Sequence, residues 1–235
     1  MYHLSQTKIL TSIKSLKEAM LVSNKGIDII DFKNPALGTL GALPIDKIKS
    51  CLKVIPSEQL TSATIGDIYD IEEIKKKTFL LSKLEIDFIK IGFFFDEKNF
   101  KNLFNIKKIV KNKKIIAILF ADKKPKLNLI KEIKKINFDG VLIDTQDKEN
   151  GNLRDYLTNS EIKDFVKFSK KENLTIGLAG SLTINDIEPL RKLHPDYLGF
   201  RGALCNSNER KDDICEISLN RVLSKFRSFV FQKAI

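Results

Sequence analysis

Short apolar stretches alternate with lysine-rich amphipathic stretches along all 235 residues, and this alternation restricts the fold more than any other feature. Eight stretches have the length and the β-branched, apolar composition of strands buried on both faces: residues 8–13, 27–32, 60–66, 87–94, 114–121, 140–144, 174–180 and 196–202. Helical spacing follows each of them, over residues 15–24, 45–55, 71–84, 97–111, 127–136, 158–172, 183–193 and 217–230. Strict alternation indicates a parallel sheet, and eight repeats predict one (β/α)8 TIM-barrel domain over residues 1–235.

A doubly wound open sheet is the alternative architecture. It would usually have fewer strands and a glycine-rich first turn, and the chain contains no GxGxxG motif. We see no linker, low-complexity tract or composition shift that would mark a second domain.

The formal net charge of +11 raises the question of an anionic partner. The lysines are spread along the chain and greatly outnumber the arginines, which is typical of solvated helix faces. Clustered arginines and interleaved aromatics, the better signals for nucleic-acid binding, are missing. We therefore expect no nucleic-acid partner and favour phosphorylated metabolites, with a non-enzymatic polyanion-binding protein kept as an alternative.

Other partners and cofactors leave little trace in the sequence. No apolar run approaches the roughly 20 residues of a membrane span, and the first ten residues lack the order of a signal peptide. Three cysteines show neither metal-ligand spacing nor a disulfide framework. We expect a cytoplasmic homo-oligomer with reduced thiols, no membrane partner, no metal and no cofactor.

Charged residues collect where the predicted strands end, which is the active-site face of this barrel class. Asp31 and Lys33 are two residues apart, so their side chains point to the same side of the strand. They form either a structural ion pair or a lysine tuned for catalysis by its carboxylate neighbour. The other polar residues near strand ends are Lys90, Asp144 and Lys148, which are further catalytic candidates, and Asp67 and Asp122, which we expect to contact the substrate.

Lys90 lies in the middle of an apolar strand and shares a side with Phe88 and Gly92. If Ile89 and Ile91 pack on the helices, Lys90 points into the barrel; otherwise it extends between the helices toward water. The convergence of carboxylates and lysines at one mouth favours the interior position. Lysines beside carboxylates suggest carbonyl chemistry, because a neutral lysine attacks an aldehyde or ketone to form a Schiff base.

The turns after the last two strands predict a phosphate site. Gly180 and Gly202 allow close approach of the backbone, and amides near Ser181 and Ala203 begin the following helices. The loops after strands seven and eight are the usual phosphate site of TIM barrels. Nearby Arg201 and Arg210 would add positive charge; ordinary turn glycines are the alternative explanation.

Several segments together resemble one known family. IDIIDFKNPALGTLGA, TSATIGD, DFIKIG, LIDTQDKENG and LAGSL followed by GFRGALC are similar, in this order, to (5-formylfuran-3-yl)methyl phosphate synthase. That family is also called 4-(hydroxymethyl)-2-furancarboxaldehyde-phosphate synthase and serves methanofuran biosynthesis. The resemblance covers nearly the whole chain. The loop after Cys205, NSNERKDDIC, differs from the family by having lost its glycines.

The resemblance implies a (β/α)8 barrel that condenses two molecules of glyceraldehyde 3-phosphate, with loss of phosphate and water. By position, Lys33 matches the Schiff-base lysine and Lys90 the proton acceptor, while Asp31, Asp144 and Lys148 match the remaining catalytic positions. We expect Asp31 to orient Lys33. A Schiff-base aldolase or isomerase acting on another small sugar phosphate is the alternative on the same fold.

Overall fold

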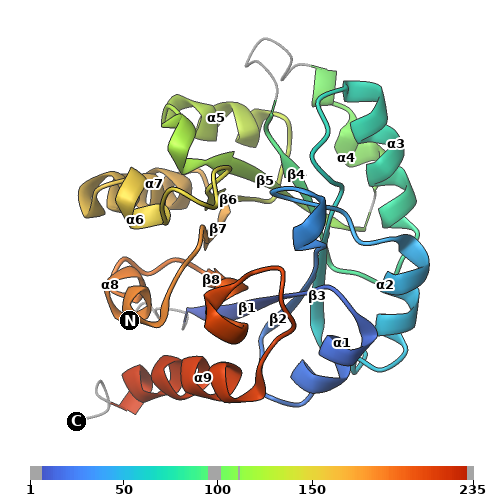
Figure 1. The fold of residues 1–235 in the computed structure, drawn as a ribbon. Helices are drawn as coiled ribbons and strands as arrows, with labels where there is room; N and C mark the ends of the chain where they lie inside the picture. The colour runs from blue at the N-terminus through green and yellow to red at the C-terminus, as the bar shows by residue number, and fades with distance from the viewer. Residues whose placement is uncertain (1–6, 95–101, 111, 232–235) are drawn as a thin grey trace.

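The computed structural model describes residues 7–94, 102–110 and 112–231, and these form a closed parallel barrel of eight strands (Figure 1). In chain order the strands are β1 (Lys8–Ile13), β2 (Ile29–Phe32), β3 (Leu60–Thr64), β4 (Phe88–Gly92), β5 (Lys114–Phe120), β6 (Gly140–Asp144), β7 (Thr175–Leu178) and β8 (Tyr197–Phe200). β8 pairs in parallel with β1, with Thr11 opposite Phe200. This pairing closes the sheet, so the predicted TIM barrel is confirmed and the open sheet is wrong.

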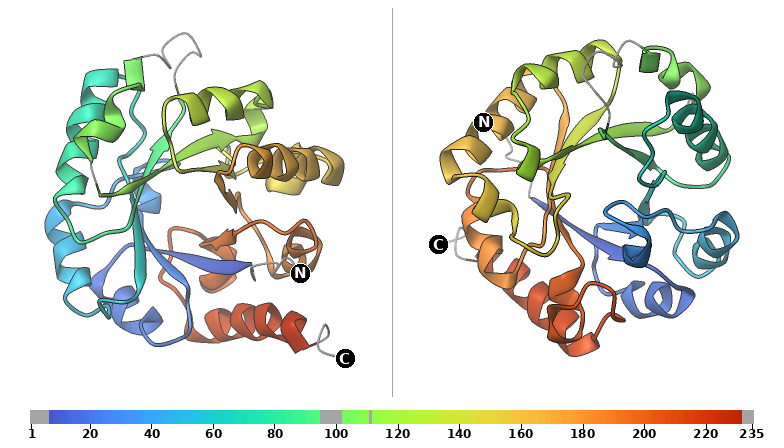
Figure 2. Two further views of the ribbon diagram at one scale, coloured as in Figure 1. Left: turned by 180° about the vertical axis from the view of Figure 1, so that it is seen from behind. Right: turned by 45° about the horizontal axis from the view of Figure 1, so that its top comes forward.

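Helices surround the barrel on its outside (Figure 2). Their bounds are α1 (Leu16–Val22), α2 (Ile45–Leu52), α3 (Ile71–Ser82), α4 (Ile106–Ile109), α5 (Asn128–Lys135), α6 (Leu153–Tyr156), α7 (Asn159–Lys171), α8 (Ile187–Arg191) and α9 (Glu216–Phe231). The helix predicted over residues 97–111 lies partly outside the described residues. No helix in the described part of the chain is both long and apolar enough to cross a membrane.

The strands separate two apolar layers. Outward side chains such as Ile30, Phe32, Ile89 and Ile91 join the large core between the barrel and the helices. Inward side chains near the N-terminal ends of the strands form a second, smaller cluster: Leu10, Ile29, Ile116, Leu142 and Tyr197. Because one face of each strand packs on helices and the other fills the barrel, both need apolar residues.

The barrel interior changes from apolar to polar toward the C-terminal ends of the strands. One layer of the sheet aligns Ser12, Asp31 and Ser62 on three neighbouring strands. Asp31 is fully buried. This change places the polar groups at the mouth where TIM-barrel active sites form.

Candidate active site

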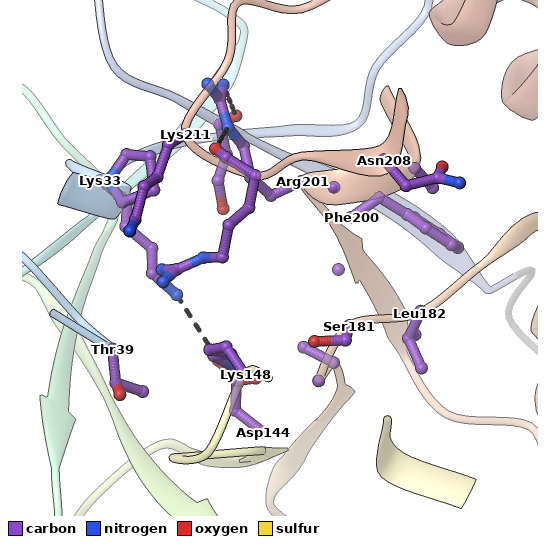
Figure 3. Close-up of a pocket in the computed structure, with 18 of the residues that line it drawn as sticks. Lys33, Thr39, Asp144, Lys148, Ser181, Leu182, Phe200, Arg201, Asn208 and Lys211 are labelled. Atoms are coloured by element: carbon purple, nitrogen blue, oxygen red, sulfur yellow. Dashed lines mark hydrogen bonds and ion pairs between the residues drawn. The ribbon is translucent and has the colours of Figure 1, made fainter. Parts of the chain in front are cut away.

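A cavity of about 640 Å³ opens at the C-terminal ends of the strands (Figure 3). Its walls come from β1, β4, β6 and β8 and from the loops that follow β2, β6, β7 and β8. The predicted site residues that line it are Lys33, Lys90, Asp144, Lys148, Gly180, Ser181, Arg201, Gly202 and Ala203. Asp31 lies just below, in contact with Lys90.

Lys90 points into the barrel, as the position of its isoleucine neighbours predicts. Its ammonium lies 2.6 Å from a carboxylate oxygen of Asp31. Asp31 also accepts hydrogen bonds from Ser12 Oγ at 2.8 Å and from Ser62 Oγ at 2.6 Å. Burial lowers the pKa of Lys90, while the Asp31 charge opposes this shift and the Lys33 charge reinforces it. A lysine in such a place releases a proton more easily than one in water.

Lys33 faces a different carboxylate, Asp144, at an N–O distance of 3.5 Å. Asp144 ends β6 and is also bound by the ammonium of Lys148 and by the amide of Thr145 at 2.8 Å. Burial favours the neutral acid, but Lys148 and Lys33 together hold the pKa of Asp144 below its ordinary value. Asp144 is therefore a permanent anion between two lysines.

Lys148 is itself shifted toward neutral pH. Burial lowers its pKa to about 8, with the Asp144 charge opposing the shift and the Lys33 charge adding to it. Its ammonium also donates to Thr145 Oγ1 at 3.1 Å. A group with this pKa exchanges protons readily near physiological pH.

The expected pairing of Asp31 with Lys33 is corrected by the structure. Asp31 is level with Ser12 and Ser62, whereas Lys33 lies two residues further along, roughly 7 Å nearer the mouth. At that height Lys33 reaches Asp144 from β6, and Asp31 pairs with Lys90 from β4. Each lysine thus takes its carboxylate from another strand.

The turn after β7 has the tight geometry that the glycine signal indicates. Gly180 has a φ of +108°, and a Cβ there would lie 2.9 Å from Thr145 Cγ2 and 3.1 Å from the Thr145 amide nitrogen. Ser181 follows with a φ of +49°. These two residues line the cavity together with Gly202 and Ala203, which begin the 3-10 helix η5 (Gly202–Leu204) after β8. Their binding of phosphate stays a prediction.

Arg201 has a bonding pattern that the sequence analysis missed. Its guanidinium donates to both carboxylate oxygens of the buried Glu18, at 2.7 and 3.0 Å. It also donates to the carbonyls of Ser12, Arg210 and Asp212. All three of its nitrogens are engaged by protein oxygens, so this geometry assigns Arg201 to holding the loop and gives no support to a phosphate ligand there.

Asp67 and Asp122 were predicted to contact substrate, and neither lines the cavity. Asp67 accepts the amides of Thr39 at 2.8 Å and Leu40 at 2.6 Å, which fixes the loop after β2. Asp122 accepts the amide of Gln146 at 2.6 Å and so fixes the loop after β6. Both carboxylates therefore fix loops that line the cavity, without lining it themselves.

Sequence reasoning also missed several wall residues. Thr39, Asn208 and Lys211 line the cavity, and Arg210, noted only as extra charge, does so as well. Their loops have no periodic pattern of apolar residues from which side-chain positions could be predicted. The only sign in the sequence was that NSNERKDDIC differs from the family. Among the described residues, no group of three or more His, Cys, Asp or Glu side chains could hold a metal ion.

A family model described as 4-HFC-P synthase matches residues 9–223. A (5-formylfuran-3-yl)methyl phosphate synthase of Archaeoglobus fulgidus is 33% identical and covers 86% of this chain and 92% of its own. The protein of the same name from Methanococcus aeolicus is 30% identical and covers 92% of this chain and 98% of its own.

Solved structures show the fold alone. Phosphoribosyl anthranilate isomerase from Thermus thermophilus superposes with a TM-score of 0.69 at 12% identity and covers 95% of this chain and 100% of its own. 3-Hexulose-6-phosphate synthase from Salmonella typhimurium gives a TM-score of 0.68 at 16% identity, with coverage of 94% and 100%.

Proposed function

Because this chain belongs to the 4-HFC-P synthase family, whose members are (5-formylfuran-3-yl)methyl phosphate synthases, we propose that it condenses two molecules of glyceraldehyde 3-phosphate. The products are one (5-formylfuran-3-yl)methyl phosphate, one inorganic phosphate and two waters, which balances all atoms. The reaction needs no net oxidant or reductant.

One observation carries this proposal: two buried lysines, each with a carboxylate from another strand, lie at one cavity. Lys33 is near the mouth beside Asp144, and Lys90 is deeper beside Asp31. A condensation of two carbonyl compounds needs an electron sink on one of them and a group that removes protons. The two pairs supply these functions at different depths.

We assign the Schiff base to Lys33. Its Nζ adds to the carbonyl carbon of one triose phosphate, after isomerisation to the ketone, and the carbinolamine loses water to give an iminium. The iminium withdraws electrons from the adjacent carbon, so Lys90 can remove a proton there. The resulting enamine then attacks the aldehyde carbon of the second molecule and forms the carbon–carbon bond.

The later steps are eliminations at the Asp144 end of the cavity. The bond from carbon to the departing phosphate oxygen breaks, and its electron pair leaves with the phosphate. Lys148, as an ammonium, donates a proton to an oxygen that leaves; Asp144 holds it in place. Ring closure and loss of water complete the furan and release Lys33.

The test is incubation of the purified protein with glyceraldehyde 3-phosphate alone. Mass spectrometry should detect the furan phosphate, with an equal amount of free phosphate. Borohydride added during turnover should fix a triose phosphate on Lys33. Lys33→Ala should lose both the product and the adduct and keep its fold, whereas Lys76→Ala, on the exposed side of α3, should keep both.

Two outcomes would contradict the proposal. Full turnover by Lys33→Ala would remove the Schiff-base assignment. Interconversion with dihydroxyacetone phosphate, without furan or released phosphate, would instead indicate an isomerase or aldolase.

A further inference from the structure

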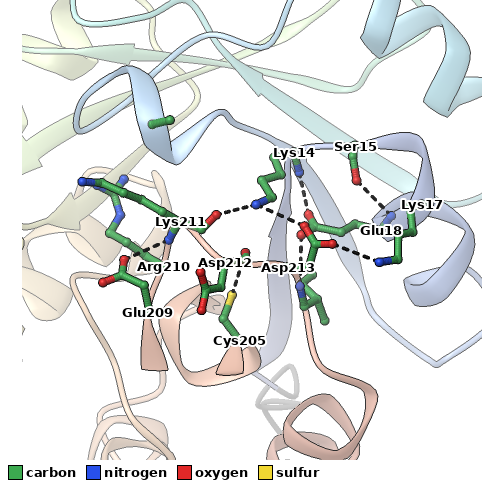
Figure 4. A network of polar contacts seen from close by, with 12 residues as sticks. Lys14, Ser15, Lys17, Glu18, Cys205, Glu209, Arg210, Lys211, Asp212 and Asp213 are labelled. Carbon is green, nitrogen blue, oxygen red and sulfur yellow. Dashed lines mark hydrogen bonds and ion pairs between the residues drawn. The ribbon is translucent and has the colours of Figure 1, made fainter. Parts of the chain in front are cut away.

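The loop between β8 and α9 runs along the edge of the cavity and reaches the loop that follows β2. Arg210 in this loop donates from Nη2 to the carbonyl of Gly38, 3.1 Å away, in the loop that follows β2. Two contacts hold the loop in place. Arg201 donates to the Arg210 carbonyl, and Lys14 donates to the Lys211 carbonyl (Figure 4). Lys14 also pairs with Asp213 at 3.2 Å. Arg210 and Lys211 are thereby held at the edge of the cavity.

Positive charge exceeds negative charge on this side of the cavity. Asp144 is the deep carboxylate here, and it is bound by Lys33 and Lys148 while Arg210 interacts with it electrostatically. One carboxylate therefore faces three cations, with Lys211 as a fourth at the rim.

The other acidic side chains near Arg210 and at the rim offset part of this excess, but among the described residues none of them forms an ion pair with Lys33, Lys148 or Lys211. Asp67 attracts Arg210 electrostatically, and its carboxylate accepts hydrogen bonds from two backbone amides. Asp147 accepts the amides of Glu149 and Asn150 within its own turn. Glu209 accepts the amide of Lys211, and Glu149 is exposed.

This cationic side is separate from the predicted phosphate turn after β7. Arg210 is bonded to the loop after β2, whereas Gly180 and Ser181 follow β7, and β8 and β1 lie between those strands. Lys33 and Lys211 accordingly lie on one side of the mouth and Ser181 and Leu182 on the other (Figure 3). A cavity of about 640 Å³ has room for ligands at both ends.

We propose that Arg210, supported by Lys148 and Lys211, forms a second phosphate subsite that holds the phosphate of the second triose phosphate. This rests on the proposed function, which brings two phosphate dianions into one cavity. Dianions at a single anchor would repel each other, so two separated anchors are required. A planar guanidinium matches phosphate oxygens in pairs, and the partial burial of Arg210 strengthens each bond.

Direct binding tests the subsite without any turnover. We expect calorimetric titration with inorganic phosphate to show two sites in the wild type and one in Arg210→Ala. Arg210→Lys should keep two sites, with affinity at the second lowered about 10-fold. The lysine keeps the charge but lacks the paired N–H donors of the guanidinium. Arg221→Ala removes the same charge from the exposed part of α9 and should bind as the wild type does.

Kinetics separate the second substrate from the first. In Arg210→Ala, borohydride should still fix one triose phosphate on Lys33, while furan formation and phosphate release should fall about 10- to 100-fold. Raising the concentration of glyceraldehyde 3-phosphate should recover part of the rate, since the defect is one of binding.

Several results would overturn this inference. A single phosphate site in the wild type, or two unchanged sites in Arg210→Ala, would remove the subsite. If Arg210→Ala lost imine trapping and turnover to the same extent, Arg210 would bind the first substrate and not the second. If Arg210→Ala fails to fold by circular dichroism, Arg210→Lys decides by the same titration. A wild type that binds two phosphates yet forms no furan would refute the proposed function and leave the anion subsite standing.

Discussion

At the scale of single residues, the site depends on charges that satisfy one another across the barrel. Asp31 has no exposed surface. It pairs with the ammonium of Lys90 and accepts hydrogen bonds from Ser12 and Ser62. A buried carboxylate with three donors is well compensated, but each partner depends on the others. Removing one charge leaves its partner buried without compensation.

Asp31→Asn should lower the free energy of unfolding by about 3 kcal/mol, because it leaves the Lys90 ammonium buried without its carboxylate. Urea denaturation measures this change. Asp31→Asn combined with Lys90→Met should be more stable than Asp31→Asn alone, since both charges are then gone. Asp46→Asn, on an exposed position of α2, serves as the control. A double variant no more stable than the single one would contradict the pairing.

The pH dependence of turnover should report Lys148. Its pKa of about 8 means that raising the pH from 7 to 9 converts most of its ammonium to the amine. The proposed role is proton donation, so kcat should fall across this range with a midpoint near pH 8. Lys148→Arg stays protonated over this pH range. Its kcat should be lower than that of the wild type but should no longer fall between pH 7 and 9. A rate that rises through pH 8 would make Lys148 a base.

At the scale of elements, the strands were predictable and the loops were not. Each strand has an apolar pattern of its own, so the sequence could locate all eight and place Lys90 inside the barrel. The charge pairs could not be predicted, because the partner of Lys33 depends on how the strands are staggered around the barrel. The pairing of Arg201 with Glu18 joins β8 to α1 over 183 positions and likewise has no local signal.

The turn after β7 gives a prediction at this scale. Gly180→Ala should destabilise the protein by at least about 1 kcal/mol, because an alanine disfavours a positive φ and its Cβ would meet Thr145. It should also weaken phosphate binding at this end of the cavity. Gly66→Ala is the control for the contact with Thr145, because Gly66 has the same φ of +108° and a Cβ there would meet no atom nearer than 3.6 Å. Thermal unfolding and phosphate titration measure both effects, and unchanged values would contradict the described turn.

At the scale of the whole molecule, the +11 net charge and the cationic side of the mouth act in the same direction. Both would attract the proposed phosphorylated substrate from a distance, and salt screens this attraction over roughly 10 Å at 0.1 M. We expect kcat/KM to fall severalfold between low and high ionic strength, while kcat changes little. Steady-state kinetics in sodium chloride measure this, with sorbitol as a control for osmolarity. A salt-independent kcat/KM would mean that the dispersed lysines serve solubility only.

The closure of β8 on β1 has a consequence for the newborn chain. Arg201, just after the last strand, binds the carbonyl of Ser12 on the first, and Ser12 in turn holds Asp31. During synthesis, Lys33 and Lys90 leave the ribosome long before Arg201 does. The carboxylate partners of both lysines lie on β2 and β6, but the barrel closes and the cavity is complete only when β8 has paired with β1. An incomplete chain therefore carries the two lysines without the finished cavity. If the proposed chemistry holds, barrel closure confines reaction with aldehydes to finished molecules.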